Sequence, residues 1–578
     1  MPAQWQDIAR RKQEERNARI APEWELQDTL SASGGSILDV PRRCGLLTNH
    51  EIDITEQYDA TRLSYELAAG RIKSEHVVRA FCKRAAIAQQ LTNCLTEIFF
   101  EDAIARAREL DQHLEKTGKP LGPLHGLPIS LKDTFKVRGY DASVGVASLC
   151  FKPATSNSAL VDILLSLGAV LFCKTNIPQT MMGVALDSHN NVFGRTLSPA
   201  NSKLTPGGSS GGEGALVAMR GSILGVGTDV GGSIRIPAAC NGLYGLKPSH
   251  GRVPFAGQEG GKRSGSSKVE IEATAGPIAT TVRDLELFMR AVGNAGAEAL
   301  DAEVVPQTWA SLPLLSTTNK PLRVGVARTD GHVKPLPPIE TLMKEVAQTL
   351  RSSGNHAIEI VEVDVSPVLS RCVKTFNGIM SLDGNNQWLD LLEPTGEPLS
   401  PWLQSRINRR PRKETKEVVK LQASRLELQA AFLQVWKESG GYWMTGAGEA
   451  RLGDRTLDAI ICPVAPHPIP EIDRWNTANY TAAWNLLDLS TGVVPVRKFT
   501  KQDLRGEVPS SEPLNGWDKI NRELWTKVDR NVYLDSPLSV QVVTPRLTER
   551  QLVQAMAVID EAVRPLRERQ AELGASKL

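Results

Sequence analysis

The sequence predicts an α/β protein whose β-sheet is largely buried. Apolar runs of strand length occupy residues 127–131 and 169–173, and residues 160–167 between them have helical spacing that stops at Gly168. The order strand, helix, strand recurs later in the chain, at 322–327, 340–350 and 358–363. Strands that alternate with helices are typical of α/β folds, and strands without polar alternation are typical of a sheet covered on both faces.

Ahead of the first strand, the sequence predicts a polar arm and two helices. Residues 1–55 read as a charged, partly helical arm that continues into an irregular segment containing Gly34, Gly35 and Pro41. Apolar residues then recur at helical spacing, at Val77, Val78, Phe81 and Ala85. A second helix is predicted over residues 103–114. We therefore expect the arm to end, and the folded domain to begin, near residue 55.

The second half of the chain continues the alternation. Residues 385–440 are helical and charged, so their basic side chains form a solvated helix face or, alternatively, a binding patch. A strand is predicted over residues 457–461, ended by Pro463. An apolar helix face near the end is formed by Leu552, Ala555, Met556, Ile559 and Val563. Residues 257–268 and 500–516 are predicted to be loops.

Composition places the chain among globular proteins. Its 578 residues are 41% hydrophobic and 23% charged, which is enough to bury a large core. The formal net charge of +2 gives no bias toward nucleic acid or an anionic membrane surface. No apolar run is long enough to span a bilayer, and no signal-peptide pattern follows Met1.

Cysteine and histidine usage argue against a disulfide framework and against a metal centre. The eight cysteines are scattered and form no CxxC pair, which is typical of reduced thiols inside a cell. The nine histidines never fall into HxxxH or HxH spacing, so no metal site is expected.

The last three residues, Ser576, Lys577 and Leu578, match a peroxisomal address. This tripeptide predicts recognition by the peroxisomal import receptor and a place in the peroxisomal matrix. The alternative is a chance match on a cytoplasmic protein.

Two clusters of glycine and serine carry the chemistry of this chain. Residues 207–212 read GGSSGG and residues 231–233 read GGS, and an apolar, Ala-rich segment separates them. Glycine lets the backbone come close to a ligand and aim N–H groups at one point. The clusters could be flexible linkers, but the apolar segments that flank both favour packed turns.

Cleavage of an amide or an ester needs a nucleophile, a base and donors for the oxyanion. Ser233 lies in a turn that can supply such N–H donors, and Lys132, at the end of an apolar strand, is a candidate base. Ser209 could relay a proton between them, because serine and lysine can form such a unit without histidine. Lys132 and Ser233 are 101 positions apart, so Lys132 could also be an ordinary surface lysine.

The first cluster allows a second interpretation. Residues 207–211 satisfy GxSxG, the nucleophile elbow of α/β-hydrolases, which would make Ser209 the nucleophile and could recruit His467 to a triad. Residues 199–206 are loop-like, whereas an elbow needs a buried strand there. The cluster also lacks the GK[ST] ending of a phosphate-binding P-loop.

At these residues the chain resembles the amidase signature family, and within it the fungal acetamidase-like amidases. The resemblance starts near Thr55 and rests on GLPISLKD around Lys132 and on the whole glycine- and serine-rich run at 207–238. Further similar segments are GLKPSHGRVP at 245–254, AGPIATTVRDL at 275–285, DAIICPVAP at 458–466 and YTAAWNLLD at 480–488.

The resemblance implies a single large domain over residues 56–578, preceded by an arm like the one at 1–55. Its mixed central sheet would be enclosed by helices, with a signature core at about 120–290 and a helical, more variable region at about 385–440.

The resemblance also implies a Ser-cisSer-Lys triad, in which Ser233 forms the acyl-enzyme, Ser209 is the bridging serine with a cis peptide and Lys132 is the base. By the same match, the N–H groups of an oxyanion hole come from Val230, Gly231, Gly232 and Ser233. Positions that support the triad match Ser210, Asp229 and Arg235, and Met181 falls near a substrate-facing position.

We therefore expect an amidase that converts a small or primary carboxylic amide to an acid and ammonia or an amine, without a cofactor or a metal. The alternatives are an acyltransferase that passes the acyl group to an amine or alcohol, and a catalytically idle scaffold. A homodimer is the default expectation for assembly. The sequence does not identify the substrate.

Overall fold

The computed structural model describes residues 4–27, 36–181, 187–260, 269–312, 314–315, 321–353, 358–439, 457–474 and 477–575. Most of the predicted loop at 257–268 and the tripeptide Ser576–Leu578 therefore lie outside the described residues. Within the described residues, no helix is both long and apolar enough to cross a membrane.

An eleven-stranded mixed sheet runs through the molecule, with the strand order β1-β3-β2-β6-β8-β7-β12-β13-β11-β9-β10. Parallel pairs (β3 with β2, β2 with β6, β11 with β9, β9 with β10) lie toward the two ends, and antiparallel pairs join them in the middle. The strands are β1 (Leu95–Ile98), β2 (Pro128–Lys132), β3 (Val170–Thr175), β6 (Leu224–Asp229), β7 (Tyr244–Lys247), β8 (Thr274–Ala279), β9 (Leu322–Val326), β10 (Ile358–Glu362), β11 (Ala459–Pro463), β12 (Ser490–Lys498) and β13 (Pro537–Thr544). Two short strands, β4 (His189–Asn190) and β5 (Gly194–Arg195), form a separate ladder.

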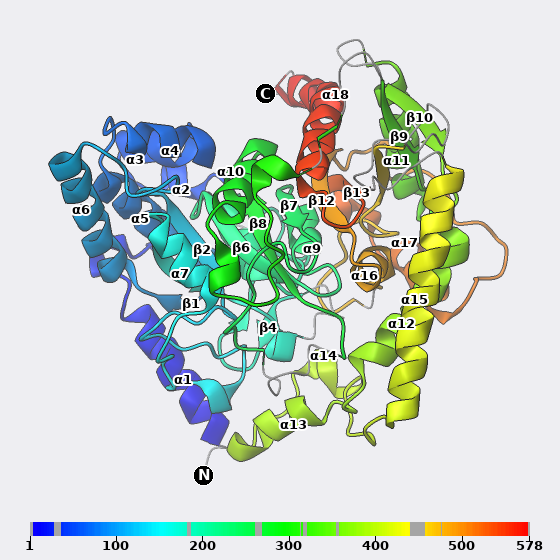
Figure 1. Cartoon of the computed structure of the whole chain (residues 1–578), viewed down its shortest axis with the longest axis horizontal. Coiled ribbons are helices and arrows are strands. Elements are labelled where there is room, and N and C mark those ends of the chain that lie inside the picture. Colours follow the sequence, from blue (N-terminus) through cyan, green and yellow to red (C-terminus); the bar gives the residue numbers. More distant parts are fainter. Residues whose placement is uncertain are drawn as a thin grey trace.

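Helices enclose this sheet, as the resemblance implies. Figure 1 shows α5 and α6 at one end of the molecule, α12 and α15 at the other, and α18 beside β12. The helices are α1 (Gln4–Asn17), α2 (Val40–Arg43), α3 (Asn49–Glu56), α4 (Ala60–Ala68), α5 (Ser74–Thr92), α6 (Phe100–Thr117), α7 (Ala159–Ser166), α8 (Gly211–Ala218), α9 (Arg235–Cys240), α10 (Val282–Gly293), α11 (Pro337–Arg351), α12 (Ser366–Met380), α13 (Asn386–Leu392), α14 (Pro401–Gln404), α15 (Thr415–Glu438), α16 (Asn479–Leu486), α17 (Gly516–Thr526) and α18 (Glu549–Ala575). The α/β class with a mixed, enclosed sheet is confirmed.

The predicted elements match the observed ones closely where apolar runs are long. The helix predicted over residues 160–167 is observed as α7, one residue earlier, and the neighbouring runs form β2 and β3, two strands that are buried at every position. The strand predicted over residues 457–461 is observed two residues later, as β11, and it ends at Pro463 as predicted. Pro463 is the last residue of β11 and pairs with Val540 of β13, because a terminal strand position tolerates a residue without an N–H donor.

The sheet topology brings two chain segments together at one edge. β2 and β6 are parallel neighbours, with Leu131 paired to Val226, so their carboxyl ends lie side by side. Lys132 is the last residue of β2, and Asp229 is the last residue of β6. The turn that follows β6 leads through Ser233 into α9, and α8 packs against β2, β3 and β6. The carboxyl edge of β2 and β6 is therefore the place to look for the predicted site.

Candidate active site

Lys132 is buried and bonded to one of the predicted serines. Its side chain ends a strand that is buried at every position, and the residue is 1% exposed. Lys132 Nζ donates to Ser209 Oγ at 2.7 Å and to Thr228 Oγ1 at 2.9 Å. The alternative of an ordinary surface lysine was therefore wrong, because parallel pairing of β2 and β6 encloses the end of β2.

The surroundings of Lys132 favour its neutral form. Burial is the largest influence and lowers the pKa of Lys132 to about 7, while the negative charge of Asp229, and that of Glu213 when Glu213 is ionised, act in the opposite direction. No carboxylate of the described chain lies within ion-pair distance of Nζ, and the partners of Nζ in that part of the chain are hydroxyl and carbonyl oxygens. A lysine with this pKa has a free amine in a large fraction of molecules at neutral pH, which is what a general base needs.

Ser209 lies in a tightly packed turn and follows a cis peptide bond from Gly208. Gly207 has φ +80°, and a Cβ there would lie 2.9 Å from Pro237 Cα. A Cβ on Gly208 would lie 2.1 Å from the carbonyl oxygen of Asp187. The turn therefore requires glycine at both positions, and it is not a flexible linker.

The second glycine turn is held by Asp229. Its carboxylate accepts from Gly232 N at 2.7 Å and from Ile234 N at 3.1 Å. Gly232 has φ +126°, and a Cβ there would lie 2.3 Å from Thr481 Oγ1. Ser233, between the two bonded residues, is half-buried, whereas Ser209 is 2% exposed. The fold thus leaves Ser233 more accessible than the serine bonded to the lysine.

A backbone bond joins the two turns, because Ser210 N donates to the carbonyl oxygen of Ser233 at 3.2 Å. Ser210 Oγ also contacts the carbonyl oxygen of Thr228 at 3.4 Å. Lys132, Ser209 and the Ser233 turn therefore share one small region, although the hydroxyl of Ser233 has no hydrogen-bond partner among the described residues.

Gly231 and Ser233 contribute backbone N–H groups that are not used by other described residues. By contrast, the N–H of Gly232 is directed at Asp229. Of the predicted oxyanion donors, Gly232 is therefore the one already bonded, whereas the N–H groups of Val230, Gly231 and Ser233 have no partner among the described residues and are free to bind a ligand oxygen.

Arg235 holds Asp229 in place from the start of α9. Both side chains are fully buried, with Arg235 Nη2 3.1 Å from Asp229 Oδ1 and 2.6 Å from Asn485 Oδ1. Burial opposes the charged form of Asp229, but Arg235, Lys247 and Asn485 together hold the pKa of that carboxyl well below its ordinary value. A charged carboxylate thus fixes the shape of the turn that carries Ser233.

Replacing Arg235 with methionine is expected to destabilise the fold strongly. The change leaves the buried Asp229 charge without its cation, and breaking a buried pair in this way costs about 3–5 kcal/mol of unfolding free energy. Chemical denaturation of wild type and Arg235→Met measures this difference. Arg10→Met is the matched control, because the guanidinium of Arg10 is exposed on α1. The Arg10→Met variant should unfold at the same midpoint as the wild type. An unchanged midpoint for Arg235→Met would contradict the role of this pair.

In this structure His467 is not bonded to Ser209, as the nucleophile-elbow interpretation requires. His467 is 4% exposed, and its Nδ1 lies 2.7 Å from the carbonyl oxygen of Pro468. Among the described residues its Nε2 has no partner, while Ser209 contacts Lys132. The segment ahead of Gly207 is irregular, as the sequence predicts, and does not form the strand that an elbow needs.

Met181 remains a prediction as a substrate-facing residue. It is half-buried at the end of a short 3-10 turn and packs against the apolar cluster of Val144, Val146, Ile177 and Leu392. Residues 182–186, which follow it in the loop, lie outside the described residues.

Sequence reasoning missed three side chains of the site. Thr228 shares Lys132 with Ser209, and Thr481 Oγ1 donates to the carbonyl oxygen of Gly231 at 2.6 Å. The ring of Phe376, on α12, lies 3.2 Å from where a Gly231 Cβ would be. Of these three, only Thr228 could have been inferred from the sequence, because it lies near the end of a predicted strand. Thr481 and Phe376 belong to helices that are far from the glycine turns in the sequence.

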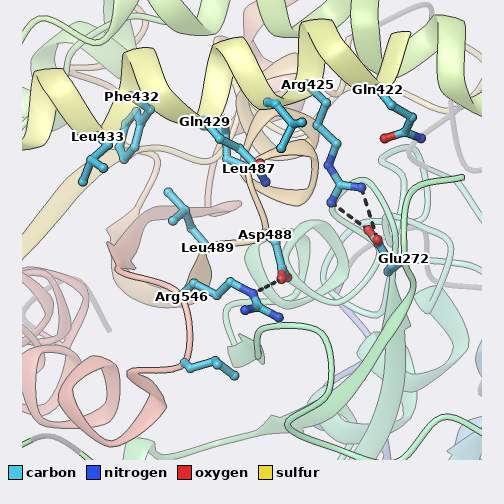
Figure 2. A pocket seen from close by; sticks show the side chains of 12 residues that line it. Glu272, Gln422, Arg425, Gln429, Phe432, Leu433, Leu487, Asp488, Leu489 and Arg546 are labelled. Carbon is cyan, nitrogen blue, oxygen red and sulfur yellow. Dashed lines mark hydrogen bonds and ion pairs between the residues drawn. The ribbon is translucent and has the colours of Figure 1, made fainter. Parts of the chain in front are cut away.

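A large hollow elsewhere does not contain this site. It measures about 640 Å³ and lies between α15 and the segment that follows α16. Figure 2 shows two ion pairs in its lining, one between Arg425 and Glu272 and one between Arg546 and Asp488. Their nitrogen–oxygen distances are 2.7 Å and 2.5 Å. Neither Lys132 nor any of the candidate serines lines it, so it is not the candidate active site.

The fold and the site define an α/β enzyme with a buried lysine bonded to serine beside a second glycine-serine turn. Comparison with known proteins gives the family, because the model of the family Amidase matches residues 76–553. The chain therefore belongs to the amidase family, and it is an amidase, a hydrolase that acts on carbon–nitrogen bonds.

Similar proteins cover nearly the whole chain. An acetamidase of Aspergillus oryzae is 37% identical over 95% of this chain and 97% of its own length. An acetamidase of Emericella nidulans is 36% identical over 97% of this chain and 98% of its own length. Among solved structures, a fatty acid amide hydrolase superposes with a TM-score of 0.83 at 28% identity, covering 96% of this chain and 95% of that one.

Proposed function

We propose that the protein hydrolyses a carboxylic amide through an acyl-enzyme on Ser233. Neutral Lys132 takes the proton of Ser209 as Ser209 takes that of Ser233, and the Ser233 oxygen bonds to the carbonyl carbon. The carbon–nitrogen bond then breaks, and the proton returns through Ser209 to the departing ammonia or amine. Water cleaves the ester and regenerates Ser233. The observation that carries this proposal is the 2.7 Å contact between buried Lys132 and Ser209.

The second glycine turn supports the oxyanion step. We assign the oxyanion to the turn at residues 230–233, with the free N–H groups of Gly231 and Ser233 as its main donors. The carbonyl oxygen of Gly231 already accepts from Thr481, and Asp229 fixes Gly232. Both contacts preorganise the turn, so the donors need little reorganisation when charge develops.

A small or primary amide is the substrate that we favour. Two of the relatives at 36–37% identity are named acetamidases, whereas the solved structure named for fatty acid amides is 28% identical. Phe376 packs close to Gly231, which narrows the space beside the proposed oxyanion site.

A series of amides tests the proposed reaction. Ammonia and acid release would be measured for straight-chain primary amides from acetamide to a long-chain amide, with Ser233→Ala as the control. We expect the highest kcat/KM for the short members and equal amounts of acid and ammonia. Faster turnover of the long-chain amide would overturn the preference for small substrates, and no release from any amide would overturn the reaction.

The rate of acylation is expected to rise with pH around neutrality. Lys132 accepts a proton only when it is neutral, and its pKa is lowered to about 7. Acidification therefore protonates the base, and the rate should fall about tenfold per pH unit well below that value. Labelling by a fluorophosphonate between pH 5 and pH 9 measures the profile. A rate that is independent of pH, or one that rises only near pH 10, would contradict the assignment.

A further inference from the structure

Glu213 is a buried carboxyl group that the proposed reaction does not use. It lies in the first turn of α8, four residues after Ser209, and it is fully buried. Its hydrogen-bond partners among the described residues are the hydroxyls of Ser130 and Thr175, and no cation of the described chain pairs with it. A charged carboxylate held in this way would be costly, because a buried charge normally needs a partner of opposite sign.

The carboxyl group connects the helix that follows Ser209 to the strand that carries Lys132. Glu213 Oε2 lies 2.6 Å from Ser130 Oγ on β2, and Oε1 lies 2.9 Å from Thr175 Oγ1 on β3. Ser130 precedes Lys132 by two residues, so both side chains leave the same face of β2. Thr175 is paired with Lys132 across the two strands. The Glu213 side chain thus connects α8 to β2 and β3 close to Lys132.

The backbone around Glu213 is shaped for this contact. A Cβ on Gly225 of β6 would lie 2.1 Å from Glu213 Oε2 and would displace the carboxyl group. Gly212 N donates to the carbonyl oxygen of Asn176 at 3.0 Å, and a Cβ on Gly212 would lie 2.4 Å from Asn176 N. The first turn of α8 can therefore approach β3 closely only because Gly212 and Gly225 have no side chains.

The hydroxyl protons around Glu213 can be counted. Ser130 has one hydroxyl proton but two oxygen neighbours, Glu213 Oε2 and Ser222 Oγ, the latter at 2.9 Å. Ser222 Oγ in turn lies 3.0 Å from the carbonyl oxygen of Leu224, to which its own proton can go. When Ser222 donates to that carbonyl oxygen, Ser130 can donate to Ser222, and a proton on the Glu213 carboxyl group then makes the 2.6 Å contact with Ser130.

The titratable groups that face Glu213 fit this assignment. Burial raises the pKa of Glu213 to about 8, opposed by the hydroxyls of Ser130 and Thr175 and by Lys132. Burial also raises the pKa of the Cys94 thiol to about 12 and that of Cys173 well above its ordinary value, so both thiols are neutral near pH 7. Lys132 is the remaining group, and an ionised Glu213 would favour its charged form.

We propose that Glu213 is a positioning residue that acts as a protonated carboxylic acid. Its hydrogen bonds connect α8 to β2 and β3, which keeps Ser209 within hydrogen-bond distance of Lys132. Because the carboxyl group is protonated, Glu213 adds no negative charge to that of Asp229 near Lys132. The proposal rests on the proposed function of Lys132 and Ser209.

Two substitutions of Glu213 distinguish the effect of its hydrogen bonds from the effect of its ionisation. Glu213→Gln keeps the shape and the hydrogen bonds but cannot ionise, whereas Glu213→Leu keeps much of the volume and removes both bonds. We expect Glu213→Gln to label with a fluorophosphonate within about threefold of the wild-type rate, with the acid limb of its pH profile unmoved. We expect Glu213→Leu to lose about thirtyfold or more in kcat with little change in KM. The reason is that the hydrogen bonds of Glu213 orient the base Lys132 and do not contact the substrate.

Smaller changes keep the test valid if Glu213→Leu does not fold. Ser130→Ala and Thr175→Val each remove one partner of the carboxyl group and should each slow labelling about fivefold to tenfold. Thr92→Val is the matched control, since its buried hydroxyl donates to the carbonyl oxygen of Ala88 in its own helix and makes no hydrogen bond to Glu213, Ser130 or Thr175 within the described chain. Wild-type labelling in both strand variants, or in a folded Glu213→Leu, overturns the positioning role.

The protonation state has its own readout, which does not depend on catalysis. Infrared spectra of wild type minus Glu213→Gln should contain the carbonyl band of a protonated carboxylic acid at pH 7. If that band is missing, or if the acid limb of Glu213→Gln moves down by a pH unit or more, Glu213 works as a carboxylate and this part of the proposal is wrong. If Ser233→Ala labels like the wild type, the proposed function fails, and the infrared result still decides the protonation of Glu213.

Discussion

Replacing Ser233 with alanine is expected to abolish acylation and to reduce amide turnover by about 10⁴-fold or more. The reason is that Ser233 is the more accessible of the two serines, since it is half-buried, whereas Ser209 is 2% exposed and is bonded to Lys132. The fold should survive, because the Ser233 hydroxyl has no hydrogen-bond partner among the described residues. Fluorophosphonate labelling followed by intact mass measures acylation, and a thermal melt checks the fold.

The control for this result is Ser209→Ala. It interrupts the relay but leaves the nucleophile, so slow labelling of Ser233 should persist. If Ser209→Ala abolishes labelling while Ser233→Ala is labelled normally, Ser209 is the nucleophile, and the elbow interpretation is correct despite the position of His467.

Lys132→Met is expected to reduce acylation by about 10³-fold or more and to remove its dependence on pH near neutrality. Methionine fills the space of the lysine stem without a base, so Ser209 loses the group that takes its proton. Burial of the amine works against its charged form, so the substitution should not lower the stability of the fold greatly. Single-turnover labelling across pH measures both effects.

Thr228→Val is the matched control for Lys132→Met. It removes the 2.9 Å contact to Nζ but leaves the bond from Lys132 to Ser209, so labelling should fall by about tenfold at most. The double variant Lys132→Met/Ser233→Ala should be no slower than Ser233→Ala, because residues that act as one unit are not additive. Normal labelling of Lys132→Met would remove the lysine from the mechanism.

The local features of the site could be predicted because they depend on short stretches of sequence. The apolar run before Lys132 predicted a buried strand with a lysine at its end, and β2 ends at Lys132. The glycine pairs predicted tight turns, and Gly207 and Gly232 do adopt positive φ. The resemblance added the cis peptide before Ser209, which the structure contains.

Contacts between distant segments could not be predicted in the same way. Lys132 and Ser209 are 77 positions apart, and Thr481 reaches Gly231 across 250 positions. Periodicity describes which face of an element is apolar, but it does not specify which element packs against that face. Phe376 was missed for this reason, since a phenylalanine in a helix is more often part of a core.

By itself, the sequence determined which segments become strands and helices, where glycine must allow a tight turn, and to which family the chain belongs. Only the tertiary structure decided that Lys132 is enclosed, that Asp229 holds the turn of Ser233, and that Glu213 joins α8 to two strands. The physical reason is that the pKa of a buried group and the partner of a hydrogen bond depend on what surrounds each atom in space. Those surroundings come from strand order, which places β2 beside β6 and so brings Lys132 to Thr228, 96 positions further along the chain.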